Sequence, residues 1–173
     1  LASRILGNVL LSQGYDVKVS EVHGMSQRGG SVVTYIKFGE KVYSPVIEKG
    51  QADIIVSFEA LEAARWVSFL KKGGKLVMNT QEIEPMPVIT GAAQYPANIV
   101  DTLKSLGEDV IAVDALSLAE QAGTSRAVNV VLMGVISHIL DFGDKVWNDA
   151  LEQCVPAKVL EVNKKAFGLG RNA

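Results

Sequence analysis

The chain has 173 residues, of which 48% are hydrophobic and 21% are charged, and its formal net charge is −2. This length and composition suit one globular domain with a sizeable core. The near-neutral charge, without a basic block, gives no reason to expect binding to nucleic acid or to an anionic membrane surface, and no apolar run reaches the roughly 18 residues of a membrane span.

The first residues have the apolar spacing of a helix. Hydrophobic side chains recur at intervals of three, four and five between Leu1 and Leu10, which predicts a helix that ends at about Ser12, before Gly14. Because a buried helix normally follows a cap or a turn, we expect further residues before Leu1.

A polar, glycine-rich loop follows between two strand-like runs, residues 16–20 and 31–38. Gly29 and Gly30 permit positive φ and close approach to the backbone, and the Arg28 guanidinium offers a fork for phosphate or carboxylate. Functional residues often lie on such loops. The alternative is a well-capped turn in which Arg28 pairs with Glu21.

The segment after the second strand reads as a hairpin. Gly39-Glu40 fits a tight turn with glycine in its first central position. Residues 41–44 would return antiparallel, and Pro45 fits an edge or a strand end.

The pattern changes at Asp53. The run 53–58 is nearly all apolar, as in a strand buried on both faces of a parallel sheet. A helix over 59–70, a stop at Gly73-Gly74 and a strand over 75–79 complete a βαβ unit with a right-handed crossover.

The rest of the chain alternates in the same way. We expect helices over 97–106, 115–121 and 126–140, a strand over 110–114, and a helical tail from Lys145 with a break near Pro156. The helix over 126–140 is apolar on most sides and should be buried. The expected fold over residues 1–173 is a single α/β domain with three α/β/α layers, Rossmann-like, with a mostly parallel sheet plus an antiparallel hairpin.

The two histidines and one aspartate are further candidates for a chemical role. His23 has Glu21 two residues away, but Gly24 follows at once, so the pattern does not favour a metal site. His138 lies on the most apolar helix and is interpreted as a hydrogen-bonded core or interface histidine. Asp114 ends a strand, where ligands often bind in α/β folds, but a helix cap is the favoured role.

Cys154, the single cysteine, excludes an intrachain disulfide and an iron–sulfur cluster or thiolate zinc site made by this chain alone. It is expected to be a small buried hydrophobe, and the composition indicates a reducing, cytoplasmic compartment. The chain has no Walker loop and no G-x-S-x-G elbow. No catalytic residue can be assigned from these patterns.

The loop over residues 20–32 closely resembles that of the gamma-subunit family of 2-oxoacid:ferredoxin oxidoreductases, and its His-Gly-Met-Ser-Gln-Arg-Gly-Gly form favours the indolepyruvate branch. Four other stretches agree with the family: residues 1–7, 43–47 with 50–55, 127–129 with Gly134, and 163–167. Family members begin with a strand and a Gly-Gly-Gln-Gly-like loop, which this sequence lacks. The resemblance implies that both precede Leu1.

The resemblance implies a subunit that is inactive alone. These enzymes oxidatively decarboxylate a 2-oxoacid to an acyl-CoA and pass electrons to ferredoxin. Thiamine diphosphate and the iron–sulfur clusters would be held mainly by large, alpha-type partner subunits, with coenzyme A as co-substrate and no cofactor bound by this chain alone. The candidate cofactor-binding residues are Glu21, His23, Gly24, Ser26, Arg28, Gly29 and Gly30.

Several alternatives stay open at this point. The substrate could be pyruvate, 2-oxoglutarate or ketoisovalerate instead of an aryl pyruvate. The chain could be a free-standing Rossmann-like protein that binds a nucleotide or acyl-CoA, or an assembly subunit with an inert loop. The sequence leaves a homodimer open as well.

Overall fold

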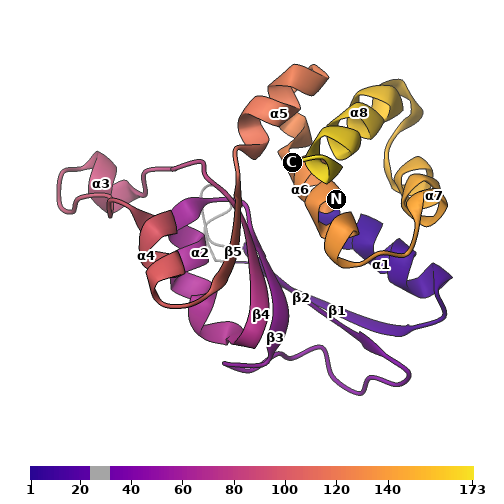
Figure 1. Ribbon diagram of the computed structural model, residues 1–173, viewed down its shortest axis with the longest axis horizontal. Helices are drawn as coiled ribbons and strands as arrows, with labels where there is room; N and C mark the ends of the chain where they lie inside the picture. Colours follow the sequence, from indigo (N-terminus) through magenta and orange to yellow (C-terminus); the bar gives the residue numbers. More distant parts are fainter. Residues whose placement is uncertain (24–31) are drawn as a thin grey trace.

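The computed structural model describes residues 1–23 and 32–173, and a parallel sheet divides the described chain into layers (Figure 1). Its strands are β3 (Ala52–Ser57), β4 (Leu70–Asn79) and β5 (Asp109–Val113), in the order β3-β4-β5. Both pairs are parallel, with Ile55 opposite Leu76 and Leu76 opposite Val110. The predicted βαβ unit is thus confirmed, with β4 between its two neighbours.

Helices cover both faces of this sheet. On one face, α2 (Ala60–Trp66) and α4 (Ile99–Ser105) pack against the side chains of Leu76 and Met78. On the other face, Val77 packs into a larger cluster that includes α6 (Val128–Ile139). Successive strand residues point to opposite faces, so the apolar run of β4 supplies both cores. The three-layer α/β/α prediction is confirmed.

The larger core lies among helices. Helices α1 (Ala2–Ser12), α5 (Ala115–Ala122) and α8 (Leu160–Arg171) pack against α6, and α7 (Asp144–Cys154) packs against α1 and α8. The described residues also form three single 3-10 turns, η1 (Val67–Phe69), η2 (Ser125–Ala127) and η3 (Ala157–Val159). Every residue of α6 from Val130 to Ser137 is buried, as predicted. Helices α6 and α8 cross closely because Gly134 and Gly170 have no side chain: a Cβ on Gly170 would lie 1.9 Å from the Val131 carbonyl oxygen.

The antiparallel pair is formed by β1 (Asp16–His23) and β2 (Val32–Gly39). Its register runs from Asp16 opposite Gly39 to His23 opposite Val32, so β1 is three residues longer than predicted. The pair packs against α1. The ring of Tyr15, in the connection between α1 and β1, meets the ring of Phe38 edge-on with centroids 5.2 Å apart.

Two sequence predictions are wrong. Residues 41–44 form no strand, because β2 pairs with β1 instead, and the Val42 amide donates to Asp16 Oδ2 at 2.9 Å. Gly73-Gly74 does not precede β4 but lies within it. The pairing jumps from Leu70 opposite Ala52 to Lys75 opposite Ile54, and the positive φ of Gly73 accommodates the irregularity.

The remaining element, α3 (Met86–Ile89), is a single turn in the connection between β4 and α4. Figure 1 shows this connection reaching away from the sheet. No helix among the described residues combines the length and apolarity that crossing a membrane requires.

Candidate functional site

The described part of the predicted loop is its base. The strand ends bring Glu21 opposite Thr34 and His23 opposite Val32, and Ser3 Oγ donates to Glu21 Oε1 at 3.0 Å. The hairpin end that carries the loop therefore lies beside the start of α1. The other predicted site residues, Gly24, Ser26, Arg28, Gly29 and Gly30, lie outside the described residues, so the choice between an anion site and an Arg28–Glu21 pair stays a prediction.

The carboxyl ends of the parallel strands form a second polar region, which the sequence interpretation missed except at Asp114. Asn79, at the end of β4, is fully buried. Its Nδ2 donates to the Phe58 carbonyl at 3.1 Å and its Oδ1 accepts from the Ala115 amide at 3.1 Å. One amide side chain thus joins the segments that follow β3 and β5, and it satisfies backbone groups that would otherwise be unpaired.

Glu59 is the most constrained carboxylate in this region and is only 8% exposed. It caps α2 by accepting from the Glu62 amide at 2.8 Å, and it also accepts from the Ile83 amide at 3.2 Å and from the Tyr95 hydroxyl. Burial alone would raise the pKa of the Glu59 carboxyl, but the hydrogen bonds from Tyr95 and from backbone amides outweigh it and hold the pKa below its ordinary value of 4.5.

Tyr95 completes this network. Burial, followed by its hydrogen bond to the Glu59 carboxylate, raises the pKa of the Tyr95 hydroxyl well above 10. The same hydroxyl oxygen accepts from the Leu61 amide at 3.1 Å. Glu59 and Tyr95 therefore hold structure in place, and both stay in one protonation state at neutral pH. Glu is not among the residues preferred at a helix N-cap and nothing local points to Tyr95, so the sequence carries no signal for this network.

Asp114 has the role that the sequence favoured. Its Oδ1 accepts from the Ser117 amide at 3.0 Å and its Oδ2 from the Ser117 hydroxyl at 2.6 Å, so it caps α5. These hydrogen bonds hold the pKa of the Asp114 carboxyl below its usual range. The cap prediction is confirmed.

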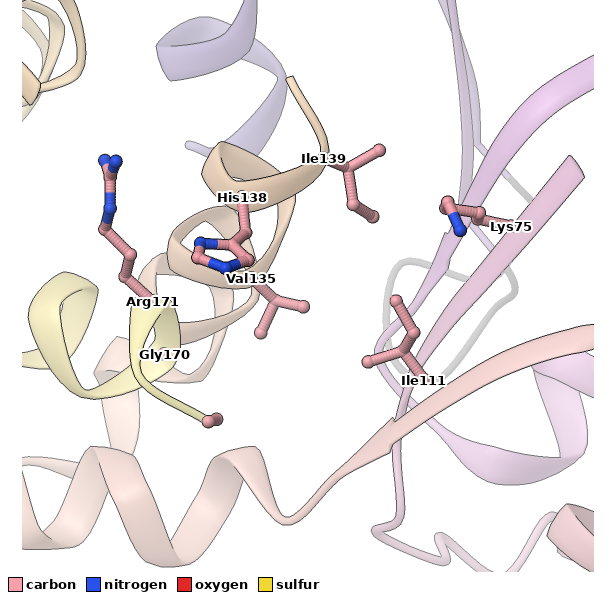
Figure 2. Close-up of a pocket in the computed structure, with 8 residues that line it drawn as sticks. Lys75, Ile111, Val135, His138, Ile139, Gly170 and Arg171 are labelled. Atoms are coloured by element: carbon pink, nitrogen blue, oxygen red, sulfur yellow. The ribbon is translucent and has the colours of Figure 1, made fainter. Parts of the chain in front are cut away.

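A cleft of 370 Å³ lies at the other end of the sheet, between the strands and the C-terminal ends of α6 and α8 (Figure 2). Ile111, Val135 and Ile139 give it apolar walls, and basic side chains stand at its sides. Both cations that line it already have carboxylate partners. Lys75 pairs with Asp109 across β4 and β5, and Arg171 Nη1 lies 2.5 Å from Asp144 Oδ1.

His138 lines the same cleft and is exposed, so a place in the core is wrong, and the interface alternative stays a prediction. It lies in the last turn of α6, past the buried stretch that ends at Ser137. Cys154 is buried as predicted, and Asn8 Nδ2 lies 2.9 Å from its sulfur. In the described parts of the chain, no three His, Cys, Asp or Glu side chains are grouped closely enough to hold a metal ion.

Residues 1–173 match the family described as pyruvate ferredoxin/flavodoxin oxidoreductase. The indolepyruvate oxidoreductase subunit IorB of Thermococcus kodakarensis is 42% identical over 99% of this chain and 88% of its own length. The ketoisovalerate oxidoreductase subunit VorA of Methanothermobacter marburgensis is 24% identical over 95% of this chain but only 32% of its own.

Solved structures share the fold at low sequence identity. The gamma subunit of a keto/oxoacid ferredoxin oxidoreductase from Geobacter sulfurreducens superposes with a TM-score of 0.69 at 19% identity, over 99% of this chain and 88% of that one. A 2-oxoglutarate:ferredoxin oxidoreductase chain from Magnetococcus marinus, solved with 2-oxoglutarate, coenzyme A and succinyl-CoA, gives 0.73 at 16% identity, over 99% of this chain but 28% of that one. The same fold thus occurs both as a small chain and within a much longer chain.

Proposed function

Because the chain belongs to the pyruvate ferredoxin/flavodoxin oxidoreductase family, we propose that it is the small subunit of a cytoplasmic complex that oxidises indolepyruvate or another aryl pyruvate. It is a subunit of a 2-oxoacid:ferredoxin oxidoreductase. The observation that carries the aryl-pyruvate proposal is the 42% identity, over nearly the whole chain, with an indolepyruvate oxidoreductase subunit. The loop over residues 20–32 supports the same branch.

The proposed reaction needs groups that this chain does not offer. A 2-oxoacid and coenzyme A give an acyl-CoA, carbon dioxide, one proton and two electrons, which two ferredoxin molecules accept one at a time. An iron–sulfur cluster does not fit this chain, because Cys154 is its single cysteine and that thiol is buried beside Asn8. We therefore assign the clusters, and with them thiamine diphosphate, to larger partner subunits.

This chain contributes a scaffold that can complete a pocket on a partner. Its polar loop is attached to β1 and β2, and the base of that loop is joined to α1 by the Ser3–Glu21 hydrogen bond. We propose that Arg28 and the Gly29-Gly30 amides hold an anionic group of coenzyme A or substrate at the subunit junction. Glu21 and His23 would then orient the loop.

The test of the subunit role is activity by reconstitution. The chain alone, the large subunit alone and the co-expressed complex are each assayed for viologen reduction with indolepyruvate and coenzyme A, and pyruvate serves as the comparison substrate. We expect reduction only in the complex, and faster with indolepyruvate. Equal rates for the large subunit with and without this chain would contradict the subunit role, and a preference for pyruvate would contradict the substrate.

The loop proposal has its own test. In the complex, R28A should raise the KM for coenzyme A or for the 2-oxoacid about tenfold, which corresponds to about 1.4 kcal/mol, and R28K should recover part of that loss. R126A is the matched control, since Arg126 is exposed in the η2 turn. Unchanged constants in R28A would remove Arg28 from the site.

A further inference from the structure

The connection between β4 and α4, residues 80–98, forms an arm, called here the α3 arm. It leaves the carboxyl end of β4 and returns to α4, and Figure 1 shows α3 standing apart from the body of the molecule. Its position matters because ligands of open α/β sheets bind outside the carboxyl ends of the strands. Anything that holds the α3 arm is therefore held beside that edge.

Large apolar side chains at the α3 arm are exposed. Ile83, Met86 and Ile89 are 56%, 66% and 63% exposed, and they follow one another at intervals of three. Met86 and Ile89 are neighbours on the single turn of α3. Apolar side chains gathered on one projecting segment indicate a surface that another molecule covers.

Hydrogen bonds fix the conformation of the arm, so the exposure of these side chains is part of the folded structure. Within the tip, Ile89 and Thr90 amides donate to the Pro85 and Met86 carbonyls at 3.1 and 2.9 Å. At its base, the buried Glu59 carboxylate accepts from the Ile83 amide on the outgoing limb and from the Tyr95 hydroxyl on the returning limb. A pre-ordered segment loses little conformational entropy when it binds.

The charge of the arm indicates the chemistry of its partner. Residues 80–98 contain two acidic side chains, Glu82 and Glu84, and no Lys, Arg or His. Both flank Ile83 and both are exposed. A matching surface would be an apolar recess with basic residues at its rim.

We propose that the α3 arm inserts Met86 and Ile89 into such a recess on the large subunit of the same oxidoreductase. The partner is chosen because the fold makes up only 28% of the Magnetococcus marinus chain, where the other segments of that protein are covalently attached to it. The relatives that match over 88% of their own length are small chains, and a small chain of that kind needs a non-covalent anchor to its neighbour. This inference rests on the proposed subunit role.

The test compares variants for binding to the large subunit by titration and size exclusion. M86E/I89E should weaken the complex at least tenfold, because two charges would enter an apolar recess, while the free chain keeps its unfolding temperature. The matched control is L106E, since Leu106 is 65% exposed at the end of α4. E82K/E84K should also weaken the complex, and the loss should shrink as salt is raised.

The outcomes separate this inference from the subunit role. If the wild-type chain forms no complex with the large subunit, the proposed function fails and the inference fails with it. If the wild type binds and M86E/I89E binds within twofold of it, only the arm proposal is overturned. A wild-type dimer that M86E/I89E converts to monomers still able to bind the large subunit would assign the arm to a second copy, and would also overturn the proposal.

Discussion

The α6–α8 crossing and the α3 arm use apolar residues in opposite ways. In α6, every side chain from Val130 to Ser137 is buried against other parts of this chain, and Gly134 and Gly170 bring two backbones together. In the arm, Met86 and Ile89 are about two-thirds exposed although their backbone is well fixed. The difference indicates that the crossing provides stability to this chain, whereas the arm provides a surface to another molecule.

The largest expected change in stability comes from a substitution that disrupts the α6–α8 crossing. G170A should destabilise the chain by about 4 kcal/mol or more, because a Cβ there would meet the Val131 backbone at 1.9 Å and backbone cannot move aside easily. The matched control is G168A on the same helix, where nothing lies within 4 Å of the added Cβ. That change should stabilise the chain by up to about 1 kcal/mol through helix propensity. Urea unfolding measures both, and equal effects would refute the close-crossing explanation.

The second prediction compares the same substitution, isoleucine to alanine, in the core and in the arm. I136A should cost about 3 kcal/mol, because Ile136 is 1% exposed in the core and its loss leaves a cavity. I89A should change the free energy of unfolding by less than about 0.5 kcal/mol, because Ile89 is already in water. A cost of 2 kcal/mol or more for I89A would mean that the arm packs on its own chain.

Some of this contrast could be read from the sequence. The apolar run of α6 and the alternation of strands and helices are local patterns, and the structure confirms them. Gly73 and Gly74 indicate a break before β4, but pairing with β3 keeps them inside the strand. The pattern of residues 41–44 fits a strand, but tertiary contacts decide that β2 pairs with β1.

The polar sites also show that local patterns predict only contacts between residues close in sequence. Asp114 is found because a cap depends on the next three residues. The contacts of Glu59 with Ile83 and Tyr95 join residues 24 and 36 positions apart, and no local pattern carries them. In the candidate site, the sequence predicted the two strands that flank the loop, but not that they pair with each other. The core of the loop, residues 24–31, lies outside the described residues.

A smaller effect is expected where the arm joins the body. E59Q should cost about 2 kcal/mol, because the amide loses charge-assisted bonds to the Ile83 amide and the Tyr95 hydroxyl and weakens the cap of α2. E62Q is the control, since Glu62 pairs with Arg65 near the surface and such pairs contribute about 0.5 kcal/mol or less. Equal costs for the two variants would contradict the special role of Glu59.

The pH dependence sharpens this prediction. The Glu59 pKa is lowered in the folded chain, so its contribution is fully present above its ordinary value of 4.5 and is lost as pH falls through the lower folded value. The stability difference between wild type and E59Q should therefore stay constant from pH 7 to about pH 5 and shrink below pH 4.5. A difference that does not change down to pH 3 would contradict the assignment of a charged, hydrogen-bonded Glu59.

Hydrogen exchange read by mass spectrometry, on the free chain and on its complex with the large subunit, tests the contrast most directly. We expect complex formation to slow exchange in residues 80–98 and to leave the buried stretch of α6, residues 130–137, unchanged. Slower exchange confined to α6 and the helices of its core, with the α3 arm exchanging as fast as in the free chain, would contradict the account.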